Sequence, residues 1–71
     1  MEIFIKDEFI KLGQALKLAN VVSSGIEAKI LITGGDVYVN DEQELRRGRK
    51  LRNGDIVRYN NTSFIIKNEN R

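Results

Sequence analysis

The chain has 71 residues, a net charge of +2 and a pI near 9.2, and it contains neither cysteine nor histidine. Disulfides, thiolate metal sites and the usual imidazole ligand or general base are therefore excluded. The length allows one domain, near the lower limit for folding without a disulfide or a metal, and the 41% hydrophobic content allows an aliphatic core.

The first part of the chain predicts a strand followed by a short helix. Residues 2–6 are β-prone, and their alternation places Ile3 and Ile5 on one face. Residues 9–10 then lead into a helix, and residues 20–22 form a tight connection after it. Four apolar residues of this helix recur at three- and four-residue spacing and so share one face: Leu12, Ala15, Leu16 and Ala19.

A second helix has the clearest start signal in the chain. Ser24 is a favourable N-cap, and Glu27, three residues later, completes a capping box. The helix should end at Gly34 and Gly35, because glycine adopts the left-handed conformation without a Cβ penalty. Its expected buried stripe consists of Ala28, Leu31 and Ile32, with Ile26 or Ile30 at the edge.

The second half of the chain predicts short strands joined by turns. Residues 36–40 alternate apolar and polar side chains, and Asn40-Asp41 favours a hairpin turn because both residue types tolerate positive φ. Turns are also expected at residues 52–55 and 60–61, and strands at residues 56–59 and 62–67. Residues 68–71 are expected to be a frayed end. The sequence therefore predicts one α+β domain over residues 1–71, with two short helices packed on a small, mainly antiparallel sheet.

Charge is distributed unevenly around the predicted hairpin. Residues 36–44 contain four acids and no base, and residues 46–52 contain five bases and no acid. This pattern predicts an acidic hairpin tip beside a basic strand, in which Gly48 favours a bulge. Four cations of this basic run are expected to be exposed and to serve binding rather than folding: Arg46, Arg47, Arg49 and Lys50.

The start of the second helix is a candidate anion site. Free backbone N–H groups and the positive end of the helix dipole favour a phosphate oxygen there. Ser23 and Ser24 can add hydroxyl groups, Gly25 permits a close approach, and Lys29 lies one turn along. The alternative is an ordinary N-cap in which Glu27 already satisfies the backbone.

Four motifs follow one another along the chain: Ile10-Lys11-Leu12-x-x-x-Leu16, Ser24-x-x-x-Ala28-Lys29-x-x-Ile32, Gly35-x-Val37-x-Val39-Asn40 and Leu51-x-x-Gly54-Asp55-x-Val57. This ordered set resembles the RNA-binding domain first recognised in ribosomal protein S-four of the small subunit, over about residues 10–59. Because little chain lies outside the match, the chain is similar to the short stand-alone, YaaA-type members of that family.

The resemblance implies a protein without enzymatic activity that binds structured RNA, ribosomal or transfer RNA, through its two helices and the following hairpin. A ribosomal or other protein partner is also compatible with it. Together, the motifs, the basic run and the helix start give the expected RNA-binding set: Lys11, Ser23, Ser24, Gly25, Lys29, Asn40, Arg46, Arg47, Arg49, Lys50 and Arg52.

Two other functions fit parts of the sequence. An interaction module would use the charged hairpin on a protein partner, since carboxylates at Asp41, Glu42 and Glu44 would repel phosphate. A ubiquitin-like sulfur carrier would also be a small α+β chain, but such carriers resemble one another in ending Gly-Gly, whereas this chain ends Asn70-Arg71.

Enzymatic, metal and membrane functions find little support in the composition. Catalysis without histidine or cysteine would need a carboxylate or lysine with a strongly shifted pKa in a cleft that excludes water. The spacing of the acids in residues 36–44 matches no calcium loop, and no apolar run approaches the ~20 residues of a membrane span. We therefore expect a cytoplasmic protein with no metal, cofactor or membrane partner.

Overall fold

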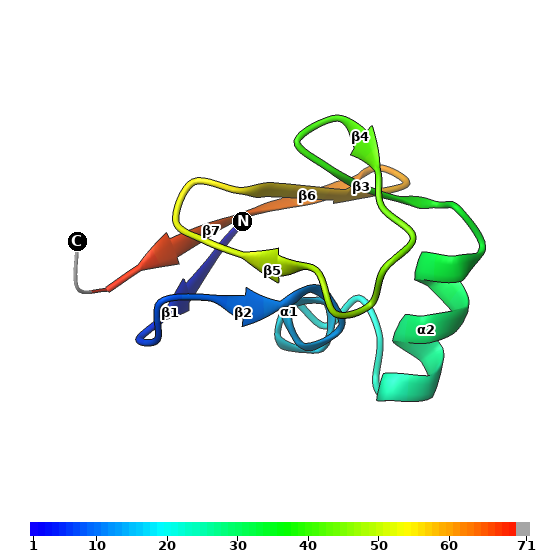
Figure 1. The fold of residues 1–71 in the computed structure, drawn as a ribbon, viewed down its shortest axis with the longest axis horizontal. Coiled ribbons are helices and arrows are strands. Elements are labelled where there is room, and N and C mark those ends of the chain that lie inside the picture. Colours follow the sequence, from blue (N-terminus) through cyan, green and yellow to red (C-terminus); the bar gives the residue numbers. More distant parts are fainter. Residues whose placement is uncertain (70–71) are drawn as a thin grey trace.

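The alternation and helical spacing of the sequence produce two helices and seven strands within residues 1–69, the part of the chain that this computed structural model describes (Figure 1). In chain order the elements are β1 (Glu2–Ile5), β2 (Ile10–Lys11), α1 (Leu12–Leu18), α2 (Gly25–Thr33), β3 (Val37–Val39), β4 (Glu42–Gln43), β5 (Lys50–Leu51), β6 (Ile56–Tyr59) and β7 (Thr62–Asn68).

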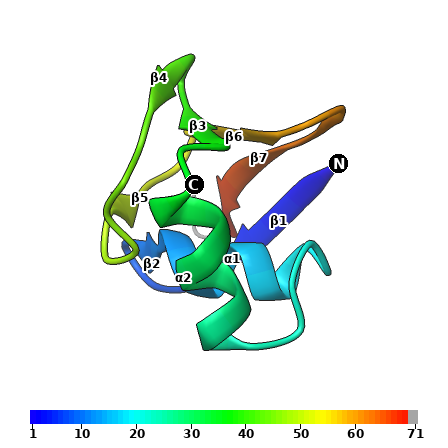
Figure 2. The same cartoon turned by 90° about the vertical axis from the view of Figure 1, so that its right-hand side faces the viewer.

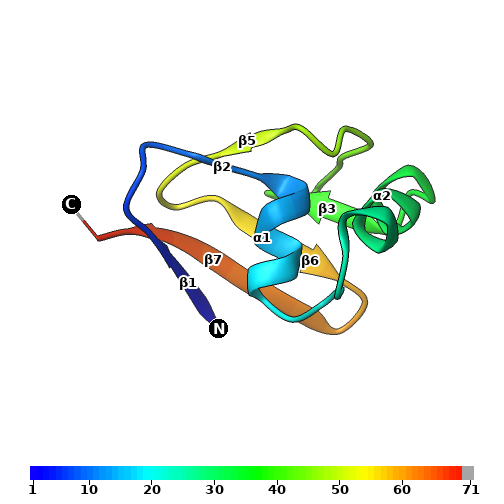
Figure 3. The same cartoon turned by 90° about the horizontal axis from the view of Figure 1, so that it is seen from below.

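Five of the strands form one sheet in the order β1-β7-β6-β3-β4, and β2 pairs with β5 in a small second sheet. Only the β1–β7 pair is parallel among the pairings of the described residues, so the expected mainly antiparallel α+β fold is confirmed. Seen from below, α1 lies over β6 and β7, with α2 beside the end of β3 (Figure 3). No helix within residues 1–69 is long and apolar enough to cross a bilayer.

The core lies between the sheet and the helices. The predicted inward positions of the first strand and the first helix are all buried, as are Val37 and Val39. In α2, Ala28 and Ile32 are fully buried and Leu31 is half-buried. Ile26 and Ile30 are instead 75% and 63% exposed, so α2 presents an apolar edge to solvent.

The predicted turns form at the expected residues. Asn40 and Asp41 have φ values of 51° and 68°, which closes the β3–β4 hairpin in the left-handed region that these side chains tolerate. Gly54 has a φ of 93° in the turn before β6, and Asn60 has a φ of 54° between β6 and β7. Gly35 follows α2 with a φ of 86°, the conformation expected after a helix end.

Two expectations about the strands are wrong. The basic run is not a strand, because residues 44–49 form a loop and only Lys50–Leu51 pairs, as β5. The chain also does not fray at residue 68: the Asn68 backbone N–H donates to Asn53 Oδ1 at 2.8 Å, and the Glu69 N–H donates to the Ile5 carbonyl at 2.9 Å. Residues 70–71 lie outside the described part of the chain.

The capping box at the start of α2 should stabilise the fold. Ser24 Oγ accepts a hydrogen bond from the Glu27 N–H at 3.2 Å, and Glu27 Oε1 accepts from the Ser23 N–H at 3.0 Å. We expect Ser24→Ala to lower the free energy of unfolding by about 1 kcal/mol, measured by urea denaturation. Ser23→Ala is the matched control and should have a smaller effect, because Ser23 contributes its backbone and not its hydroxyl to the box.

Candidate nucleic-acid interface

A buried carboxylate organises the loop between β4 and β5. Glu44 is only 6% exposed, and its Oε2 accepts from the backbone N–H and the Nε of Arg46, both at 3.0 Å. Its Oε1 accepts from Arg46 Nη2 at 3.2 Å and from Arg49 Nη1 at 2.7 Å. The hydrogen bond from the Arg46 side chain, and then that from Arg49, lower the pKa of Glu44 from 4.5 to about 2, against burial that raises it.

This ion-pair network corrects two readings of the sequence. Glu44 points inward, so it is not part of an acidic hairpin tip that repels phosphate. Arg46 and Arg49 both hold Glu44, so they serve the fold as well as any ligand. The Arg46 side chain is still 73% exposed, but that of Arg49 is only 33% exposed and half-buried.

The same loop covers the first turn of α1. The Leu12 N–H donates to the Arg49 carbonyl at 2.8 Å, and the Gly13 N–H donates to the Arg47 carbonyl at 3.1 Å. These bonds satisfy two backbone donors that a helix start leaves without helical partners. A Cβ on Gly13 would lie 2.8 Å from Arg47 Cγ, so the missing side chain lets Arg47 lie against α1.

Two lysines face each other where the β2 and β5 strands pair. Lys11 lies directly opposite Lys50 and both are exposed, while the neighbouring pair, Ile10 and Leu51, is buried. Like charges opposite each other on two strands weaken the pairing. The pair is therefore unfavourable for folding and favourable for an anion.

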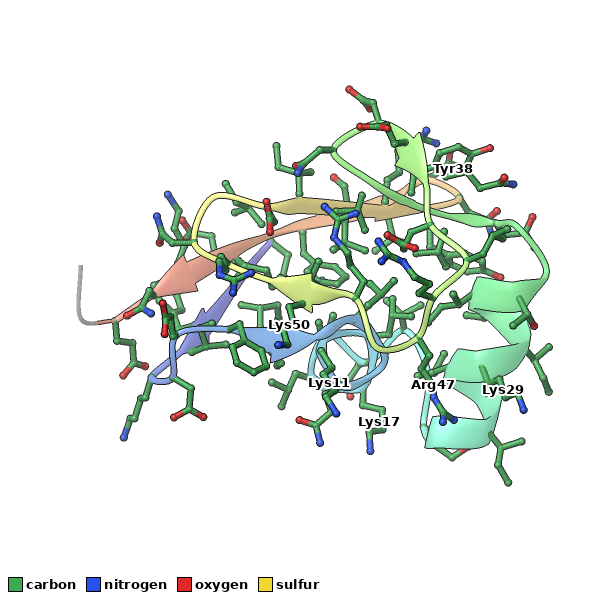
Figure 4. The ribbon with its side chains drawn as sticks, in the orientation of Figure 1. Lys11, Lys17, Lys29, Tyr38, Arg47 and Lys50 are labelled. Carbon is green, nitrogen blue, oxygen red and sulfur yellow. The ribbon has the colours of Figure 1, made fainter. Side chains whose placement is uncertain are left out.

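Five cations gather on one side of the molecule, which we call the basic face (Figure 4). They come from β2, β5, α1, α2 and the loop, and in the figure they follow one another from Lys50 on the left to Lys29 on the right: Lys50, Lys11, Lys17, Arg47 and Lys29. The two helices, which carry Lys17 and Lys29, pack against each other, and the segment from β4 to β5 passes beside them (Figure 2). Tyr38 lies away from this side, toward the opposite edge of Figure 4.

Two surface hollows are lined by cations of the basic face and of the neighbouring loop. The first, of about 320 Å³, is here called the phosphate pocket and is lined by Lys11, Gly13, Gln14, Lys17, Gly25, Arg47 and Gly48. The second, of about 510 Å³, shares Gly48 with it and is lined also by Arg46, Arg49, Lys50 and Arg52. Three cations line the first hollow and four line the second. This arrangement fits a polyanion with several consecutive phosphates better than a single small anion.

The predicted site residues divide into two groups. Those from β2 and from residues 46–52 are brought together around the two hollows, and Gly25 joins them from the start of α2: Lys11, Gly25, Arg46, Arg47, Arg49, Lys50 and Arg52. Ser23 and Ser24 lie at the capping box instead, and Lys29 is exposed on the same side but lines neither hollow.

Asn40 is engaged within the fold. Its Nδ2 donates to Asp55 Oδ1 at 3.0 Å, and its Oδ1 accepts from the Ile56 N–H at 2.9 Å, which ties the hairpin turn to the start of β6. Its motif position therefore has a structural explanation that needs no RNA.

The sequence interpretation missed three residues that matter here. Lys17 lines the phosphate pocket, and its position three residues after Gln14, on the polar side of the first helix, could have indicated it. Glu44 forms ion pairs with Arg46 and Arg49, and the spacing of an acid with arginines two and five residues later could have indicated these pairs. Phe9 contacts two cations of the basic run, Lys50 and Arg52, and no local sequence pattern predicts these contacts.

Comparisons with known proteins agree with this geometry. A family model described as "S4 domain" matches residues 3–67. This is the same S-four domain that the sequence motifs resemble. The chain is also similar to a protein of Bacillus subtilis (strain 168) named "Probable ribosome maturation protein RlbA". The two are 54% identical over 55 residues, which are 78% of this chain and 78% of that protein.

Proposed function

The chain belongs to the S4 domain family, and from this premise we propose that it binds structured RNA through its basic face, without enzymatic activity. The observation that carries the proposal is the pairing of Lys11 with Lys50 beside the phosphate pocket that Arg47 and Lys17 complete. Phosphate contacts of this kind fix the orientation of an RNA without reading its sequence.

The proposed RNA is ribosomal RNA or an assembly intermediate of the ribosome. The name of the Bacillus subtilis relative, a ribosome maturation protein, supports this choice, since that relative is 54% identical over most of both chains. We further propose that residues 1–71 act as one RNA-binding domain in the cytoplasm and need no cofactor.

Salt dependence tests the electrostatic part of the proposal. If about four cations of the basic face engage phosphates, the logarithm of the association constant should fall with the logarithm of salt concentration at a slope of roughly −3. The measurement is fluorescence anisotropy with labelled ribosomal RNA fragments over a series of potassium chloride concentrations. A slope near zero would show that phosphates do not carry the binding.

Sedimentation in a sucrose gradient tests the ribosomal part. The tagged protein should travel with ribosomal subunits or their precursors at low salt and leave them at high salt. The alternative function, a protein-interaction adaptor that uses the charged hairpin, predicts a captured protein and no RNA. In that alternative Asp41 and Glu42 could contact the partner, but Glu44 could not, because it is buried and paired with Arg46 and Arg49.

A further inference from the structure

An aromatic hollow of about 580 Å³ adjoins the phosphate pocket, between the β1–β2 connection and α1. Its lining includes the apolar side chains of Phe4, Phe9 and Leu18 together with the polar residues Lys6, Asp7, Lys11 and Gln14. Phe4 and Leu18 are 56% and 59% exposed, so apolar groups meet solvent here beside a cationic surface.

Phe9 joins this hollow to the basic run. Lys50 Nζ lies 4.9 Å from the centre of the Phe9 ring, and Arg52 Cζ lies 5.7 Å from it. These are cation–π distances, and they keep two cations close to a half-buried aromatic ring. A base that stacks on the face of Phe9 beneath these two cations requires both side chains to move, and the phosphate of the same nucleotide is a suitable partner for them.

The aromatic hollow and the phosphate pocket share a wall. Lys11 and Gln14 line both, so a group bound in one lies next to a group bound in the other. A nucleotide has this arrangement, because its base and its charged phosphate are joined through one sugar. The Gln14 amide can both donate and accept a hydrogen bond at the edge of a base.

Resting on the proposed function, we propose that the aromatic hollow receives an unpaired nucleobase of the bound RNA, stacked on Phe9. Bases stack on aromatic side chains regardless of sequence, and such sites combine the aromatic with a cationic groove that tracks the backbone. Bases inside a continuous duplex cannot reach such a ring. The protein should therefore prefer RNA with a bulge, loop or junction to a perfect duplex.

The test compares a synthetic two-strand RNA duplex that carries one bulged adenosine with the same duplex lacking it, by fluorescence anisotropy at low ionic strength. The parent protein should bind the bulged RNA about tenfold more tightly. Phe9→Leu should abolish this preference and leave duplex affinity within about twofold, because phosphate contacts carry duplex binding. Phe9→Tyr, which keeps the ring, should retain the preference.

A second measurement does not depend on any variant. With 2-aminopurine at the bulged position, saturating parent protein should change the fluorescence of that base, since stacking alters its emission. Unchanged fluorescence overturns the inference even if Phe9→Leu fails to fold. Equal loss of affinity for both RNAs in Phe9→Leu also overturns it, because the ring would then only hold Lys50 and Arg52.

The outcomes separate the inference from the proposed function. Equal, salt-sensitive binding of both RNAs by the parent refutes base stacking and leaves phosphate-based RNA binding intact. No binding of either RNA refutes both. A preference for the bulge that survives in Phe9→Leu refutes the role of the ring, since the shape of the bulged duplex would explain it.

Discussion

Replacing Glu44 by glutamine should lower the free energy of unfolding at pH 7 by on the order of 3 kcal/mol. The drop of its pKa from 4.5 to about 2 measures how strongly the folded state favours the carboxylate. Glutamine keeps the shape but not the charge that Arg46 and Arg49 hold. In a domain of this size the thermal midpoint should fall by roughly 10 °C or more, measured by circular dichroism.

The same carboxylate makes the stability depend on pH. Because the folded-state pKa lies below the ordinary value, the contribution of Glu44 is fully present above about pH 5 and is lost as the pH falls toward 2. Urea denaturation of the parent across this window should show the loss, and Glu44→Gln should show a correspondingly flatter profile. Parallel profiles of the two proteins would mean that the network contributes little.

Glu42→Gln is the matched control. Glu42 lies two residues earlier, is exposed on β4 and undergoes the same charge change. Exposed substitutions of this kind usually change stability by less than about 0.5 kcal/mol. A similar loss in both variants would assign the effect to net charge rather than to the buried ion pairs.

The sequence was sufficient where structure is decided locally. Ser24 and Glu27 predict the start of α2, and Asn40-Asp41 predicts the hairpin turn, because capping and positive φ depend on neighbouring residues. The inward positions of the first helix follow from spacing alone.

The path of the basic run is different, because distant contacts decide it. The loop is held by hydrogen bonds from the Leu12 and Gly13 N–H groups and by the inward carboxylate of Glu44. No pattern within the run encodes these partners, so an alternating strand was the natural local prediction and was wrong. The cations of the candidate site could therefore be predicted from the sequence. Which of them pair with Glu44 and which do not could not be predicted.

Arg47 is one of the cations outside the Glu44 ion pairs, and its reversal should have the largest effect on RNA binding. Arg47→Glu removes one charge-assisted phosphate contact from the phosphate pocket, a loss on the order of 1–3 kcal/mol before repulsion is counted, or roughly tenfold to a hundredfold in affinity. The slope of the salt dependence should become shallower by about 1. Fluorescence anisotropy with the ribosomal RNA fragments measures both quantities.

Folding should survive this change, because the hydrogen bond to Gly13 is made by the Arg47 backbone carbonyl, and glutamate keeps the Cγ that lies against Gly13. Arg58→Glu is the matched control: it makes the same charge change at an exposed residue whose guanidinium lies 4.5 Å from the ring of Tyr38, away from the basic face. Its affinity for RNA should fall by less than about threefold, the part that net charge alone contributes. If Arg47→Glu and Arg58→Glu weaken binding equally, RNA responds to the overall charge of the protein, and the basic face is not its binding surface.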